Sequence, residues 1–103
     1  MGKPAKKVLI VDDERMILRV LRRFLVHQGY VTYEAAGFPE ALRTFREEKP
    51  FHALLCDVYL ELDSGWKLAE QIYSSQPSIH VVMLTGSYFY EPPKRDYPYT
   101  LLL

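Results

Sequence analysis

The sequence has little cysteine and no surplus of either charge. Cys56 is its single cysteine, so no disulfide can form within the chain, which fits a reducing compartment. Thirteen Lys and Arg residues balance thirteen Asp and Glu residues. This balance gives no electrostatic reason to expect direct nucleic-acid binding by the domain.

Long hydrophobic runs are also missing. Every apolar stretch is far shorter than the roughly 20 residues of a membrane-spanning helix, so no membrane association is expected. The basic start at Met1–Lys7 is followed by an apolar stretch that stops at Asp12, which does not match a signal peptide. With no internal repeat and no low-complexity linker, we expect residues 1–103 to form one cytoplasmic domain.

What the sequence does contain is an alternation of apolar strands and amphipathic helices. Val8–Val11 is too densely apolar for a one-sided strand and predicts a central parallel strand. Alternation over Val31–Ala35 predicts an edge strand with one wet face. Further strands are expected at residues 53–56, 81–84 and 100–103. Such an alternation predicts an α/β fold with a doubly wound parallel sheet and helices on both faces.

Three helices are expected between these strands. The first carries apolar residues at helical spacing and arginines mostly on the opposite side, and Gly29 stops it. The second begins near Pro39 and ends at Lys49–Pro50, and the third precedes Pro77. The apolar positions are Ile17, Val20, Leu21, Phe24 and Leu25 in the first helix, Ala41, Leu42 and Phe45 in the second, and Leu68, Ala69 and Ile72 in the third.

Polar residues stand where three of the strands end. Asp12 and Asp13 follow the first strand, Asp57 closes the third, and Thr85 follows the fourth. Parallel sheets place their sites at the carboxyl ends of strands, so we expect these side chains to meet. Clustered carboxylates repel one another and favour a hard divalent cation such as Mg²⁺. Helix capping by the two adjacent aspartates is the alternative interpretation.

These residues resemble a known family, the receiver domain of two-component response regulators. The matching stretches lie within residues 6–86 and read VLIVDDE, ALLCD, SGWKLAEQI and VVMLTG. The resemblance implies a flavodoxin-like strand order 2-1-3-4-5. It also implies that Asp57 accepts a phosphoryl group, that Thr85 contacts that group and moves on activation, and that Mg²⁺ or Mn²⁺ binds Asp12, Asp13, Asp57 and the backbone carbonyl of Tyr59. A histidine kinase or phosphotransfer domain and an output partner would then be expected.

The chain departs from the family pattern in several places. Glu61 stands where a proline is usual, and residues 88–99 hold three prolines and four tyrosines where the family has a fourth helix. We therefore expect that helix to be absent or reduced. The family's lysine at the end of the fifth strand and its fifth helix are not reached, which suggests C-terminal truncation. Uncovered apolar surface on the first helix and last strands would then favour a homodimer. Tyr97 and Tyr99 are candidates for the family's aromatic switch residue by type alone.

Two other functions compete with a phosphoryl-accepting receiver. One is a non-phosphorylated interaction module that keeps the fold and the acidic pocket. The other is an aspartate-nucleophile phosphatase of the haloacid dehalogenase type, which needs an aspartate where this chain has Glu14. No catalytic activity beyond self-assisted phosphorylation and dephosphorylation is expected. We interpret Cys56 as a small buried hydrophobe, the three histidines as surface or packing residues, and Trp66 as a cover for apolar surface.

Overall fold

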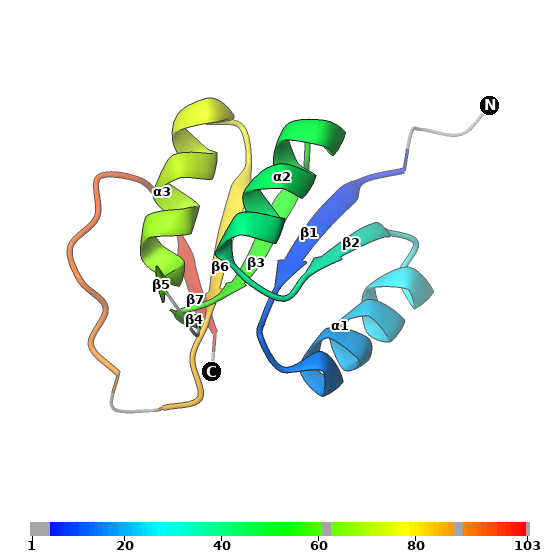
Figure 1. The fold of residues 1–103 in the computed structure, drawn as a ribbon, viewed down its shortest axis with the longest axis horizontal. Coiled ribbons are helices and arrows are strands. Elements are labelled where there is room, and N and C mark those ends of the chain that lie inside the picture. The colour runs from blue at the N-terminus through cyan, green and yellow to red at the C-terminus, as the bar shows by residue number, and fades with distance from the viewer. Residues whose placement is uncertain (1–4, 61–62, 88–89, 103) are drawn as a thin grey trace.

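The computed structural model describes residues 5–60, 63–87 and 90–102, and it shows a parallel sheet flanked by helices (Figure 1). Glu61, whose place in the family pattern belongs to a proline, lies outside these residues. The strands and helices along the chain are β1 (Lys7–Val11), α1 (Arg15–His27), β2 (Val31–Ala35), α2 (Phe38–Glu48), β3 (Ala53–Asp57), β4 (Tyr59–Leu60), β5 (Asp63–Ser64), α3 (Gly65–Ser75), β6 (His80–Leu84) and β7 (Thr100–Leu102).

The main sheet has five strands in the order β2-β1-β3-β6-β7, all neighbouring pairs parallel. The predicted order 2-1-3-4-5 is therefore confirmed, because β4 and β5 form a separate antiparallel pair outside this sheet. In register, Val11 lies opposite Cys56, and Asp57 lies opposite Leu84. The carboxyl ends of β1, β3 and β6 consequently meet at one edge.

The sheet divides the core into two unequal parts, one on each of its faces. Helices α2 and α3 pack against one face of the sheet, and α1 lies against the other (Figure 1). The larger cluster, on the α2 and α3 side, includes Leu9, Leu54 and Met83, all fully buried. The smaller cluster joins Val8 and Ile10 of β1 to Leu18 of α1. Alternate residues of β1 thus face opposite layers, as expected for a central strand.

Helix α1 differs from its predicted packing. Leu18 is buried, whereas Val20 is 62% exposed and Phe24 is 63% exposed, although both were expected among its inward-facing residues. The helix packs mainly against β1 and β2, near one side of the sheet, so part of its apolar surface has no covering element in the described chain. The predicted exposure of apolar surface on the first helix and on the last strand, where Leu102 is 48% exposed, is confirmed.

The ends of the helices follow simple backbone rules. Gly29 has a φ of 96°, a left-handed conformation that favours glycine, and it follows Gln28, the C-cap residue of α1, so the predicted helix stop is confirmed. Pro39 lies in the first turn of α2, also as predicted. The capping interpretation was wrong in its position, because the N-cap residue of α1 is Glu14, and its side chain makes no capping bond.

Residues 90–99 run as an irregular segment beside α3 before the chain enters β7 (Figure 1). Between β6 and β7 the described residues contain no helix, which agrees with the predicted reduction of the fourth helix. Tyr97 is buried and Tyr99 is half-buried, and both precede β7 rather than lying in it. None of the described helices is long and apolar enough to cross a membrane.

Candidate functional site

Three carboxylates meet where β1 and β3 end. Asp12 and Asp13 follow β1, and Asp57 is the last residue of β3. One oxygen from each carboxylate lies within 4.8 Å of the other two. Asp12 is only 5% exposed, Asp57 is half-buried and Asp13 is exposed. This is the one group of three or more His, Cys, Asp or Glu residues with such geometry in the described chain. The structure thus assembles the predicted acidic set.

Backbone amides orient the two less exposed carboxylates. Glu14 donates its N–H to Asp12 Oδ1 over 2.9 Å, and Tyr59 donates its N–H to Asp57 Oδ1 over 3.1 Å. The main chain of Asp12 is held as well, because its N–H donates to the Ala35 carbonyl in β2. Each carboxylate therefore has a defined direction before any ligand binds.

The acidic residues raise one another's proton affinity. Burial raises the pKa of Asp12 to about 6, with smaller contributions from the charges of Asp57 and Asp13, against the lowering effect of the Glu14 N–H. Burial also raises the pKa of Asp57, as do Asp13 and Glu14, and the Tyr59 N–H opposes this shift. Two unit charges about 4 Å apart repel by roughly 4 kcal/mol at an effective dielectric of about 20. A bound cation would relieve this repulsion.

The donor set fits a hard divalent cation. It consists of carboxylate oxygens, partly open to solvent, without a thiolate or imidazole among them. Such sites suit Mg²⁺ or Mn²⁺, which bind oxygen ligands and retain water molecules. Asp12, Asp13 and Asp57 are the residues that would hold the ion. The Tyr59 N–H donates to Asp57, and the Tyr59 carbonyl stays a predicted ligand.

Thr85 lies beside the acidic residues at the end of β6. It is 4% exposed and lines a pocket of about 320 Å³ together with Asp12 and Asp57. Its N–H donates to the Leu102 carbonyl over 2.8 Å, and its hydroxyl accepts a hydrogen bond from the Ser87 N–H over 3.3 Å. The hydroxyl group predicted from the strand end is therefore brought to the same pocket as the predicted acceptor.

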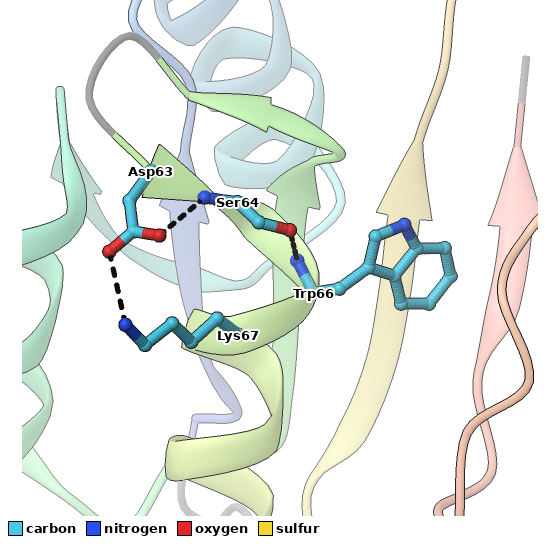
Figure 2. Close-up of polar contacts among 4 residues, drawn as sticks. All are labelled: Asp63, Ser64, Trp66 and Lys67. Atoms are coloured by element: carbon cyan, nitrogen blue, oxygen red, sulfur yellow. Dashed lines mark hydrogen bonds and ion pairs between the residues drawn. The ribbon is translucent and has the colours of Figure 1, made fainter.

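A short hairpin follows Asp57, and the strands predicted from the sequence did not include it. Strands β4 and β5 pair over two residues each, and Gly65 donates its N–H to the Val58 carbonyl over 3.1 Å. Ser64 then caps α3 by accepting from the Trp66 N–H, while Asp63 accepts from the Ser64 N–H and lies near Lys67 (Figure 2). These hydrogen bonds connect the segment directly after Asp57 to the first turn of α3.

The cysteine, the histidines and the tryptophan lie in the core or on the surface, outside the group of three carboxylates. Cys56 is fully buried beneath the site, and burial raises the pKa of its thiol, as expected for a small hydrophobe. His52 and His80 lie side by side at the amino ends of β3 and β6, with ring centroids 5.0 Å apart. His27 is exposed at the end of α1. Trp66 is 3% exposed and packs in the larger core cluster, so its predicted covering role is confirmed.

Comparison with known proteins points to one family. Residues 8–91 match the family described as the response regulator receiver domain. The alkaline phosphatase synthesis transcriptional regulatory protein PhoP of Bacillus subtilis is 34% identical over 81 residues, which are 79% of this chain and 33% of PhoP. The chain spans about a third or less of the length of the curated relatives that it matches first.

Solved structures agree with this match. The response regulator TrrA of Thermotoga maritima, crystallised with Mg²⁺ and BeF, superposes with a TM-score of 0.80 at 26% identity, over 93% of this chain and 85% of that one. A response regulator of Burkholderia pseudomallei, which holds a phosphorylated aspartate, a calcium ion and citrate, gives a TM-score of 0.81 at 29% identity. That match covers 94% of this chain and 59% of the other.

Proposed function

This chain belongs to the receiver domain family of two-component response regulators, and we propose that it accepts a phosphoryl group on Asp57 from a histidine kinase or a phosphotransfer domain. The observation that carries the proposal is the meeting of three carboxylates and the Thr85 pocket at one edge of the sheet. The acid that accepts phosphate in the Burkholderia relative is likewise an aspartate.

In the proposed reaction an oxygen of the Asp57 carboxylate attacks phosphorus, and the bond from phosphorus to the donor breaks. The donor leaves with that electron pair, and an aspartyl phosphate remains. Bound Mg²⁺ would neutralise negative charge on the acceptor and on the transferring group. The Tyr59 N–H orients the carboxylate, and the buried Thr85 hydroxyl is placed to donate a hydrogen bond to a phosphoryl oxygen.

The partners follow from the same proposal. A kinase or phosphotransfer domain supplies the phosphoryl group in the cytoplasm, and an output domain or separate protein responds to it. The chain's match to about a third of PhoP leaves room in such relatives for an output domain. Homodimerisation through the exposed apolar surface of α1 is a secondary proposal. Sedimentation at increasing concentration tests it, and an unchanged monomer mass would remove it.

Phosphorylation is tested by incubating the chain with acetyl phosphate and Mg²⁺ and measuring its intact mass. We expect a mass increase of one phosphoryl group, lost in Asp57→Asn and after addition of a chelator. Asp96→Asn, an exposed aspartate outside the site, is the matched control and should be phosphorylated like the native chain. A native chain that gains no mass with this donor or a phosphorylated histidine kinase would instead favour the non-phosphorylated interaction module.

A further inference from the structure

Tyr90 contacts both strand β4, which follows Asp57, and the first turn of α3. Its ring meets the ring of Tyr59 edge to face, with centroids 6.0 Å apart and an angle of 84° between the planes. Its hydroxyl oxygen accepts a hydrogen bond of 2.6 Å from Trp66 Nε1. One side chain from the irregular segment therefore contacts both the hairpin beyond Asp57 and the first turn of α3.

The Tyr59 side of this contact reaches the acceptor directly. The N–H of Tyr59 donates to Asp57 Oδ1, so the position of its main chain affects the direction of the carboxylate. Tyr59 is 67% exposed, so its side chain has little packing besides the contact with the Tyr90 ring. A two-residue strand pair alone is a weak restraint on this hairpin.

The Trp66 side is anchored much more firmly. Trp66 is 3% exposed, and its N–H is held by the Ser64 hydroxyl. Its carbonyl accepts a hydrogen bond from the Tyr97 hydroxyl over 3.0 Å, and its ring meets that of Tyr99 at 4.7 Å. The segment that carries Tyr90 is thus fastened to α3 at several points, which makes Tyr90 a rigid support for the exposed Tyr59.

We propose that Tyr90 is a positioning residue for the acidic site, which holds Tyr59 in place against Asp57 and transmits changes at Asp57 to Trp66 and residues 90–99. A contiguous chain of contacts can carry coupling of this kind, and the path Asp57–Tyr59–Tyr90–Trp66 supplies one. The inference rests on the proposed function, because it assumes that a cation and a phosphoryl group bind at Asp57.

The test uses Trp66, the single tryptophan of the chain, as a fluorescent reporter. Mg²⁺ is titrated into the native chain and its variants, with affinity measured by calorimetry and emission recorded separately. We expect Mg²⁺ to change the Trp66 emission of the native chain. Tyr90→Ala should weaken Mg²⁺ binding by about tenfold, the lower end of the range for residues that support metal ligands, and should abolish the emission change.

Tyr90→Phe separates the two contacts of the residue. It keeps the ring beside Tyr59 but removes the acceptor of the Trp66 Nε1 bond. We expect its Mg²⁺ affinity to stay within about twofold of the native value, while its emission change is reduced. Tyr73→Ala is the matched control. The ring of Tyr73 stacks on that of Tyr97 in the same segment, with centroids 5.4 Å apart, whereas the ring of Tyr59 packs against Tyr90. This control should leave both measurements unchanged.

The outcomes distinguish the two proposals. A native chain that binds Mg²⁺ and is phosphorylated without any change in Trp66 emission would overturn the role of Tyr90 and leave the proposed function standing. Native behaviour in Tyr90→Ala, or an equal loss in Tyr73→Ala, would also overturn it, since the effect would then be absent or merely structural. A native chain that neither binds Mg²⁺ nor is phosphorylated overturns both. If Tyr90→Ala does not fold, the affinity and emission of Tyr90→Phe decide.

Discussion

The carbonyl oxygen of Asp57 lies 1.9 Å from the point that a Cβ atom would occupy on Gly65. The end of β3 and the start of α3 therefore pack main chain against main chain, without room for a methyl group. This close approach brings the hairpin of β4 and β5 back onto the acidic site. It also ties the backbone of the proposed acceptor to the helix that carries Trp66.

Gly65→Ala should destabilise the fold, because the obstructing atom belongs to the main chain and cannot rotate away. We expect the free energy of unfolding to fall by about 2–3 kcal/mol, at the upper end for overpacking a tight site, with weaker Mg²⁺ binding as Asp57 shifts. Urea denaturation and calorimetry measure these effects. Gly86→Ala is the control, since no atom lies within 4 Å of its added Cβ, and a similar loss there would contradict the explanation.

Asp12→Asn should stabilise the metal-free chain at neutral pH. The folded-state pKa of Asp12 is about 6, above the ordinary value of 3.8 for an aspartate, so the folded state binds more protons between these values. Stability therefore falls as pH rises from about 4 to about 6, and the amide removes this loss. We expect a gain of about 1–2 kcal/mol at pH 7 after allowance for solvent screening.

The same variant should lose its advantage when Mg²⁺ is present. The native chain should gain stability from an ion bound at the proposed site, whereas Asp12→Asn lacks one of the proposed ligands and should gain less. Thermal unfolding with a chelator and with excess Mg²⁺ measures both effects, with Asp96→Asn as the exposed control. A metal-free Asp12→Asn chain that is less stable than the native chain at pH 7 would contradict the unfavourable burial and repulsion of the Asp12 charge.

Two hydrogen bonds join Gln76, at the end of α3, to the main chain of Phe51, just before β3. The Phe51 N–H donates to Gln76 Oε1 over 2.9 Å, and Gln76 Nε2 donates to the Phe51 carbonyl. Gln76→Ala leaves both main-chain groups of a buried residue without these partners, so we expect a loss of about 1–3 kcal/mol in the free energy of unfolding. Gln71→Ala, on the exposed surface of α3, should change stability by less than about 0.5 kcal/mol. Equal effects in denaturant unfolding would refute this difference.

Substitutions on α1 should separate its buried and exposed apolar residues. Leu18→Ala should cost about 2–4 kcal/mol, because Leu18 is 3% exposed in the core against β1. Phe24→Gln should change stability by no more than about 0.5 kcal/mol, since this side chain is 63% exposed. Chemical denaturation of the two variants measures the contrast. A large loss in Phe24→Gln would show that its ring is covered in solution.

The strand ends were the most predictable part of the molecule. Dense apolar runs define β1, β3 and β6, and the register of parallel strands then places Asp12, Asp57 and Thr85 at one edge. The strand order came from the family resemblance, because periodicity carries no information on which strands are neighbours.

Other features depend on tertiary contacts that a sequence pattern does not contain. The helical period of α1 predicted an inward side that includes Phe24, but periodicity cannot say how much of that side another element covers. The two-residue strands β4 and β5 are too short to produce a pattern. The need for glycine at Gly65 arises from Asp57, eight positions earlier in the chain, and appears only when β3 and α3 pack together.

The burial of Cys56 has a practical consequence for work on this protein. Its thiol has no solvent exposure, and burial raises its pKa, so little reactive thiolate is available in the folded state. Thiol reagents should therefore label an introduced surface cysteine selectively, without removal of the native one. The rate at which Cys56 itself is alkylated would then measure how often the sheet opens at the residue directly before Asp57.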